Sequence, residues 1–265
     1  MKEPVLLQQC RPGVWELILN RPERRNAFDA RLIAAMREQL EQAARQPGLR
    51  VLVLRGAGSH FSAGADLGWM QQTASLDERQ NLIDARQLAQ LLWQLDTFPH
   101  PTLALVQGAA YGGALGLIAC CDLVVAAADA RFALSEVKLG LIPATISPYV
   151  LRAIGARLAR RYMLTAEVMA ADVAERLGLV HLQASPDQSL DDAAAPLIQA
   201  ISRNAPQALA AAKQLVRDFS GRVIDEALIE DSARRLAELR VGVEAREGLD
   251  AFINKRKPAW EDKDV

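Results

Sequence analysis

Apolar and polar residues alternate with two different periods in the first part of the chain. Val14–Asn20 (VWELILN) alternates with a period of two, which predicts a half-buried strand. The apolar residues between 32 and 40 have helical spacing, and Asp29 stands where an N-cap would begin that helix. The runs 50–56 and 102–108 are short, continuous and apolar, which is typical of strands buried on both faces.

This succession of strands, turns and helices continues to about Leu134. Asp77 is expected to cap a long helix that ends near Leu95, and a loop of small residues is expected over 57–70. Such alternation predicts an α/β core with a largely parallel sheet. From Ser147 onward, almost every segment has helical periodicity instead.

The change in character predicts two structural units. We expect an α/β core over residues 1–195 and a helical C-terminal region over residues 196–265. Because no low-complexity linker separates them, the helical region is expected to pack on the core or on a neighbouring subunit.

Composition excludes several classes of function. The 265 residues are 51% hydrophobic and 24% charged, which suits a chain with a large core. Because 31 basic residues are balanced by 32 acidic ones, we expect no nucleic-acid partner. No apolar run approaches the ~20 residues of a membrane span, so no membrane association is expected. The apolar run at the N-terminus is too short for a signal peptide, which favours a cytoplasmic location.

The residues that commonly bind metals are few and scattered. The three cysteines and three histidines have no metal-ligand spacing, and no phosphate-binding loop of the Walker type is present. We therefore expect neither a metal nor a cofactor.

Two loops of small residues carry the candidate chemistry. HFSAGADL (60–67) and QGAAYGGAL (107–115) each follow a predicted buried strand, and ligands of α/β folds gather at the carboxyl ends of strands. Small side chains there would let a substrate oxygen approach two backbone N–H groups, which is the arrangement of an oxyanion hole. The alternative is that the glycines only permit tight turns and close helix packing.

Four segments, in matching order and at matching spacing, resemble the crotonase, or enoyl-CoA hydratase/isomerase, superfamily. They are LNRPERRNAF, HFSAGADL, VQGAAYGGALGLIACCDLVVAAADARFALSEVKLGLIP and AREGLDAFINKRKPAW. The resemblance implies a spiral of ββα turns followed by a helical C-terminal trimerisation region. It also implies a homotrimer, or a hexamer built as a dimer of trimers. The implied partner is an acyl-CoA thioester, so that CoA is part of the substrate rather than a cofactor.

The resemblance also assigns roles to backbone groups in the two loops. Ala63 and Gly113 match the residues whose N–H groups form the oxyanion hole of the family, where they would hold the thioester carbonyl oxygen. Gly64, Ala65 and Asp66 match the segment that lies along the CoA moiety.

Four further residues match positions near CoA in the family. Arg24 and Arg25 stand where relatives use a basic residue near the nucleotide end, and the alternative for both is a solvated charged turn. Phe252 and Lys255 match late residues that complete the CoA site, commonly from a neighbouring subunit. Lys255 also belongs to a basic cluster, so a solvated surface position is its alternative.

Glu136 matches one of the two acid/base glutamates of family hydratases, whereas Gly116 occupies the position of the other. Taken alone, Glu136 would be a solvated or capping residue. Beside an apolar acyl chain, however, its carboxyl group would have a raised pKa and could take and return a proton. No carboxylate occurs from 108 to 121, so Gly116→Glu would restore the missing group.

Three functions are compatible with a single glutamate. We favour an enoyl-CoA hydratase, which is a lyase that adds water to a short or branched 2-enoyl-CoA. GADLGWMQQ and the segment that begins at Cys120 resemble bacterial methylglutaconyl-CoA hydratase-like members of the superfamily. Those members similarly lack the first glutamate. ATISPYV in place of a glycine-rich segment also indicates an unusual acyl group. The alternatives are an isomerase that converts 3-enoyl-CoA to 2-enoyl-CoA, and a non-catalytic acyl-CoA-binding oligomer.

Overall fold

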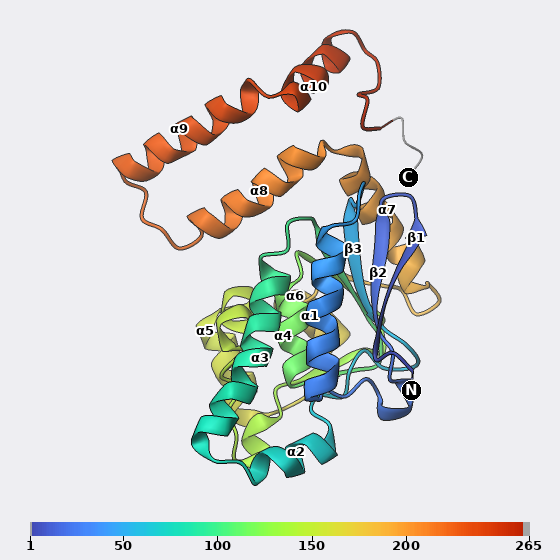
Figure 1. The fold of residues 1–265 in the computed structure, drawn as a ribbon, viewed down its shortest axis with the longest axis vertical. Helices are drawn as coiled ribbons and strands as arrows, with labels where there is room; N and C mark the ends of the chain where they lie inside the picture. Colours follow the sequence, from blue (N-terminus) through green and yellow to red (C-terminus); the bar gives the residue numbers. More distant parts are fainter. Residues whose placement is uncertain (1, 262–265) are drawn as a thin grey trace.

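The computed structural model describes residues 2–261, which form two β-sheets flanked by helices (Figure 1). The larger sheet has its strands in the order β1 (Val5–Arg11), β2 (Val14–Leu19), β3 (Val51–Gly56), β4 (Thr102–Val106), β6 (Leu123–Ala126) and β9 (Leu182–Gln183). β1 pairs antiparallel with β2, and every pairing from β2 to β9 is parallel. The prediction of a largely parallel sheet is confirmed.

The second sheet has three short strands. These strands are β5 (Ala109–Tyr111), β7 (Arg131–Ala133) and β8 (Met169–Ala170), the last followed by α6 (Ala171–Arg176). β5 follows β4 and β7 follows β6, while β5 pairs with β7 just as β4 pairs with β6. The turns through β4–β5 and β6–β7 therefore each add one strand to each sheet, and the turn through β4 and β5 ends in α4 (Gly113–Cys120). This repeat is the ββα spiral that the family resemblance implies.

Helices cover both faces of the larger sheet, which explains the continuous apolar runs in its strands. The covering helices are α1 (Ala30–Ala44), α3 (Glu78–Asp96), α4 and α5 (Ser147–Thr165) on one face, and α7 (Leu190–Arg203) on the other. In β3, Leu52 and Leu54 belong to the core under the first group, whereas Val51 and Val53 belong to the core under α7.

Two helices begin where the sequence places their N-caps. The Asp29 carboxylate accepts the Leu32 N–H at 2.8 Å and starts α1. At α3, the Asp77 carboxylate accepts the Gln80 N–H at 2.7 Å, and the Gln80 side chain accepts the Asp77 N–H at 3.1 Å. Caps of this kind stabilise a helix by about 1 kcal/mol each.

The loop predicted over 57–70 contains the start of a helix that the sequence pattern does not reveal. α2 (Leu67–Ala74) begins after Asp66, whose carboxylate accepts the N–H groups of Gly68 and Trp69. None of the α2 residues is buried. The helix therefore has no apolar face whose period could predict it.

Three C-terminal helices extend away from the sheets: α8 (Pro206–Phe219), α9 (Glu226–Arg240) and α10 (Val243–Ile253) (Figure 1). Lys213 holds α8 to the core, because its Nζ lies 2.7 Å from Asp122 Oδ2. Large apolar side chains are exposed on this extension: Val216, Val223, Ile224, Ile229, Leu236, Val241, Val243, Leu249, Phe252 and Ile253. No helix within residues 2–261 has both the length and the apolar character needed to cross a membrane.

The start of the extension differs from the predicted boundary between residues 195 and 196. That boundary falls inside α7, which packs on the sheet, so we place the start of the extension at α8. The last residues of the predicted helical region, 262–265, lie outside the described residues.

Candidate active site

Three segments lie side by side near the carboxyl ends of β3 and β4: the turn 21–28, the first loop 57–66 and the second loop 107–113. Ser62 joins the two loops, because its N–H donates to the Ala109 carbonyl at 3.0 Å and its carbonyl accepts the Tyr111 N–H at 3.0 Å. Phe28 joins the turn to the first loop by donating its N–H to the Gly64 carbonyl at 2.7 Å. The carboxyl ends of parallel strands are where α/β folds bind their ligands.

The structure corrects one of the two backbone donors predicted for the oxyanion hole. The Ala63 N–H donates to the Arg25 carbonyl oxygen at 2.9 Å, so it is not free to bind a thioester oxygen. Arg25 has a left-handed conformation with φ 52°, and this hydrogen bond holds the turn against the first loop. The Ala63 N–H therefore serves the fold rather than the substrate.

Ala65, further along the first loop, has a backbone N–H that no group in residues 2–261 accepts. Phe28 bonds to both neighbours of Ala65, donating to Gly64 and accepting from Asp66, each at 2.7 Å. In such a bridge the N–H of the middle residue points away from the partner strand. Gly64, with φ 92°, turns the chain between Ala63 and Ala65. The N–H groups of Ala63 and Ala65 therefore do not have to point to the same side of the first loop, as alternate residues of a regular strand do. Within residues 2–261 the Ala65 N–H has no acceptor, and the residue is exposed.

The second loop ends in the glycine pair that starts α4. Gly112 has φ 54° and ψ −124°, a conformation that residues with a side chain avoid. A Cβ atom at Gly112 would also lie only 3.2 Å from Oε1 of Glu136. Gly113 is the first residue of α4, and its N–H has no acceptor in the described part of the chain. A free N–H at the positive end of a helix is suited to stabilise negative charge on an oxygen.

Glu136 brings a carboxylate to this end of α4. It begins a short 3-10 helix, Glu136–Leu139, shortly after β7. Its Oε2 is buried and has no hydrogen-bond partner among residues 2–261. Burial raises the pKa of Glu136, and a backbone hydrogen bond opposes that rise only in part. A desolvated carboxylate of this kind is a stronger base than a solvated one.

Asn26 is a structural residue of the site that the sequence pattern does not single out. It is fully buried, has φ 53°, and accepts the Arg21 N–H through its side chain at 2.8 Å. Its side-chain amide donates to the carbonyls of Ala57 and His60, both at 2.9 Å. Only its residue type could have indicated this role from the sequence, because asparagine tolerates the left-handed backbone region better than most residues do.

Gly116 packs so tightly that the core cannot accept a carboxylate in its place. A Cβ atom there would lie 2.3 Å from Ile146 Cγ2 and 3.1 Å from Leu92 Cδ2. Ile146 is buried and β-branched, so it has few rotamers into which it can move. Gly116 therefore allows α4 to pack against the start of α5, and Gly116→Glu would disrupt the core instead of restoring a catalytic group.

We expect Gly116→Ala to lower the free energy of unfolding by about 1–3 kcal/mol, the usual cost of overpacking a core. In an Ile146→Ala background the same change should cost much less, because the atom that the new Cβ meets has been removed. Denaturant unfolding of the four proteins gives the coupling between the two sites. Equal costs in both backgrounds would show that Ile146 does not occupy the space.

Comparison with known proteins identifies the family. The family model described as enoyl-CoA hydratase/isomerase matches residues 9–263. The chain belongs to the enoyl-CoA hydratase/isomerase family. The 2,3-dehydroadipyl-CoA hydratase of Escherichia coli is 36% identical over 260 residues, which cover 97% of this chain and 98% of the relative.

Two solved structures have nearly the same fold as this family member. An enoyl-CoA hydratase from Shewanella pealeana has a TM-score of 0.93 at 47% identity, covering 97% of this chain and 96% of its own. AtuE from Pseudomonas aeruginosa has a TM-score of 0.93 at 38% identity, covering 98% of this chain and 100% of its own. The crotonase fold predicted from the sequence is confirmed.

Two of the residues predicted to bind CoA near the turn 21–28, Arg24 and Asp66, form an ion pair with each other within this enoyl-CoA hydratase/isomerase chain. Asp66 Oδ2 lies 2.9 Å from Arg24 Nη1 and 3.2 Å from Arg21 Nη2, in addition to its capping of α2. Burial alone would raise the pKa of Asp66, but hydrogen bonds from Arg24 and from backbone N–H groups hold it below its usual range. Arg24 and Arg25 are exposed, so contact of either guanidinium group with a nucleotide stays a prediction.

Phe252 and Lys255 lie far from the first loop within one chain. Figure 1 shows α10, which carries Phe252, at the opposite end of the molecule from α2, which follows Asp66. Phe252 is 83% exposed. A single chain therefore does not bring these residues to the first loop, and their predicted contribution would require a neighbouring subunit.

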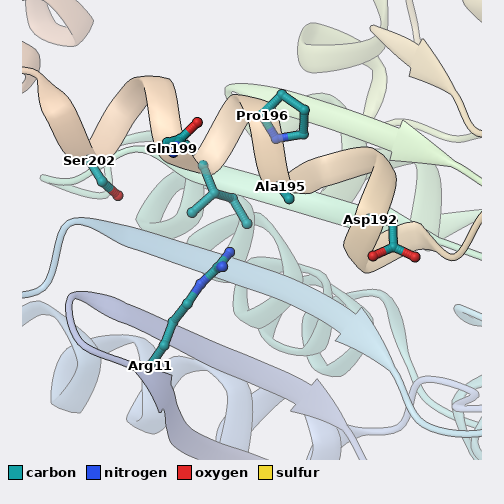
Figure 2. A pocket seen from close by; sticks show the side chains of 7 residues that line it. Arg11, Asp192, Ala195, Pro196, Gln199 and Ser202 are labelled. Atoms are coloured by element: carbon teal, nitrogen blue, oxygen red, sulfur yellow. The ribbon is translucent and has the colours of Figure 1, made fainter. Parts of the chain in front are cut away.

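Two cavities formed by the described residues lie away from Glu136. Figure 2 shows one of about 290 Å³ between β1 and α7, with the Arg11 side chain pointing from β1 toward the helix. The other, of about 600 Å³, is bordered by residues 47–50 on the core side and by α10. Neither is lined by a residue of the first or second loop. Among residues 2–261, no group of three or more His, Cys, Asp or Glu side chains is placed to hold a metal ion.

Proposed function

We propose that this protein is a hydratase that adds water across the 2,3 double bond of a short or branched enoyl-CoA thioester. The observation that carries the proposal is the Glu136 carboxyl group, whose Oε1 lies beside Gly112 at the start of α4 and whose buried Oε2 has no hydrogen-bond partner among residues 2–261. Family membership supports the class of substrate. We assign the acid/base role to Glu136 and the oxyanion hole to the N–H groups of Ala65 and Gly113.

In the proposed reaction, the Glu136 carboxylate takes a proton from water and then gives it to the substrate. The N–H groups of Ala65 and Gly113 donate to the thioester oxygen and stabilise the negative charge that develops there. Glu136 accepts a proton from water while the water oxygen bonds to C3 and the π electrons move toward the thioester. C2 of the resulting enolate then takes the proton from Glu136, which leaves a 3-hydroxyacyl-CoA and restores the carboxylate. CoA is part of the substrate, so this reaction uses no separate cofactor.

A branched acyl group that ends in a carboxylate, of the 3-methylglutaconyl type, is our first candidate for the substrate. The relative from Escherichia coli is named for 2,3-dehydroadipyl-CoA, another enoyl ester with a terminal carboxylate. The segment after Glu136 adds exposed apolar side chains, Leu139, Leu141 and Ile142, which could contact the branched carbon chain.

Isomerisation of a 3-enoyl-CoA to its 2-enoyl isomer is the second candidate. It is favoured by the packing of Ile146 against Gly116, which leaves no room for a second carboxylate at position 116. A single base suffices for this reaction, because it removes a proton from C2 and returns one to C4.

A panel of CoA esters tests the proposal. Crotonyl-CoA, 3-methylglutaconyl-CoA, 2,3-dehydroadipyl-CoA and a 3-enoyl-CoA are each incubated with the protein, and the enoyl-thioester absorbance and the mass of each product are followed. The proposal predicts loss with at least one 2-enoyl ester. Conversion of a 3-enoyl ester without hydration would support the isomerase, and binding without any turnover would support a non-catalytic acyl-CoA-binding protein.

We also propose that the protein assembles as a homotrimer, or as a hexamer of two trimers. The exposed apolar side chains of α8–α10 and the remote position of Phe252 support this assembly. We expect Ile229→Glu, on α9, to reduce the oligomer to monomers and to raise KM for CoA esters, whereas Glu230→Gln beside it should change neither. Light scattering measures the mass. A wild-type monomer with full activity would contradict the assembly.

A further inference from the structure

In the hydrogen-bond ladder between the first and second loops, a side chain takes the place of one main-chain acceptor. Three main-chain bonds join the loops: the Phe61 N–H donates to the Gln107 carbonyl at 2.8 Å, and the Ser62 N–H to the Ala109 carbonyl and the Tyr111 N–H to the Ser62 carbonyl, both at 3.0 Å. The Gln107 side chain also donates to the Gly58 carbonyl at 3.0 Å. The Ala109 N–H, at the neighbouring position, donates to Nδ1 of the His60 ring at 3.0 Å.

The reason for this substitution lies in the His60 carbonyl. In a regular parallel ladder, the Ala109 N–H would bond to the carbonyl of residue 60. That carbonyl accepts instead from the side chain of Asn26 at 2.9 Å. His60 therefore bonds to two segments with two different groups: its main chain holds the turn 21–28, and its ring holds the second loop.

The ring is also packed against the backbone of the second loop. Gly108, directly before Ala109, has φ 56°, and a Cβ atom there would lie 2.5 Å from His60 Nδ1 and 2.2 Å from the Ser59 carbonyl oxygen. No side chain separates the loops at this point. The position of the imidazole and the position of the second loop are consequently fixed relative to each other.

We infer that His60 is a positioning residue for the oxyanion hole, because its Nδ1 ties together the two loops that carry the Ala65 and Gly113 N–H groups. The inference rests on the proposed function for its activity readout. The ring does not need to touch the substrate. A shift of ~1 Å between groups that must converge on one atom can cost ~10²-fold in rate.

A pair of variants separates this role from simple packing. In His60→Asn the amide oxygen takes the place of Nδ1, whereas in His60→Gln it takes the place of Nε2, away from the Ala109 N–H. We expect H60N to retain kcat within about threefold and H60Q to lower kcat by about 10–100-fold. KM should change less, because Phe28 still holds residues 64–66, the segment predicted to lie along CoA, through its two main-chain bonds. Equal kcat values for H60N and H60Q would overturn the inference.

His181 provides a matched control. Its Nδ1 also accepts a backbone N–H, that of Val124 at 3.1 Å, but neither residue belongs to the two loops. We expect H181N and H181Q to have the same kcat as the wild type. A fall in kcat with H181Q equal to that with H60Q would show a general effect of losing such a bond, and would overturn the positioning role.

Two measurements on the protein alone keep the inference separate from the proposed function. Exchange of the Ala109 amide hydrogen should be slow in the wild type and H60N and faster in H60Q, even if no enoyl-CoA is turned over. If H60Q does not fold, the ¹⁵N shifts of His60 in the wild type test the inference instead. Nδ1 must lack a proton to accept the Ala109 N–H, so the ring proton is expected on Nε2. A proton on Nδ1 of the neutral ring, or unchanged exchange in H60Q, would overturn it.

Discussion

Glu136→Gln is expected to lower kcat by about 10³-fold, because loss of general acid/base catalysis commonly costs 10²–10⁴-fold. The amide has nearly the same shape as the carboxylate but cannot accept a proton from water. Affinity for CoA esters should change little, since the loops that would hold the thioester and CoA are untouched. Steady-state turnover of the best enoyl-CoA ester and calorimetric binding of its saturated analogue measure the two effects.

The pH dependence provides a second readout of the same prediction. Because burial raises the pKa of Glu136, its carboxyl group becomes protonated at a higher pH than a solvated glutamate. We expect kcat/KM to fall as pH drops through this raised pKa. The native state also binds this proton more tightly than the unfolded state, so the stabilising contribution of the protonated group is full at low pH and is lost as pH rises through the folded pKa. E136Q should therefore be more stable than the wild type above that pKa. Full activity in E136Q would refute the catalytic assignment.

Replacement of the Ala65 peptide N–H by an ester oxygen is expected to lower kcat by about 10²–10³-fold, the usual cost of losing one oxyanion-hole donor. The substitution, made by incorporating lactic acid at position 65, keeps the methyl side chain and removes the donor. It also makes the Gly64 carbonyl a weaker acceptor for the Phe28 N–H, so the free energy of unfolding is measured alongside kcat. It is informative because the Ala65 N–H has no acceptor within residues 2–261, so folding loses no observed hydrogen bond.

The same replacement at Ala63 is the matched control. There it removes the hydrogen bond to the Arg25 carbonyl, so we expect a loss of about 1 kcal/mol in the free energy of unfolding. The effect on kcat should be much smaller than at Ala65. The reverse pattern, with kcat sensitive at Ala63 and not at Ala65, would return the donor role to Ala63.

Local pattern predicts the elements that have an apolar face or a cap. Leu52 and Val53 lie in a continuous apolar run because the sheet is covered on both faces, and Asp29 and Asp77 cap helices through bonds within a few residues. These features depend on neighbours in the sequence and on burial, and the pattern of apolar residues indicates both. α2 has neither a buried face nor a long apolar period, so only its Asp66 cap could have indicated it.

The details of the site depend on contacts between distant segments, which no local pattern contains. Whether Ala63 or Ala65 has the free N–H is decided by the carbonyl of Arg25 and by the two bonds of Phe28. Whether position 116 can hold a second carboxylate is decided by the packing of Ile146 against Gly116. Small residues after two predicted strands located the two loops, and family resemblance singled out Glu136, but these partners became evident only in three dimensions.

Mass analysis of the product formed in H₂¹⁸O tests the central claim most directly. The protein is incubated with the 2-enoyl-CoA ester that it turns over best, and the acyl product is separated from substrate and read by mass and fragmentation. We predict a 3-hydroxyacyl-CoA that has gained one molecule of H₂¹⁸O, with the label at C3, and no such product from E136Q. A product without solvent oxygen, whether an isomer or unchanged ester, would contradict hydration by this site.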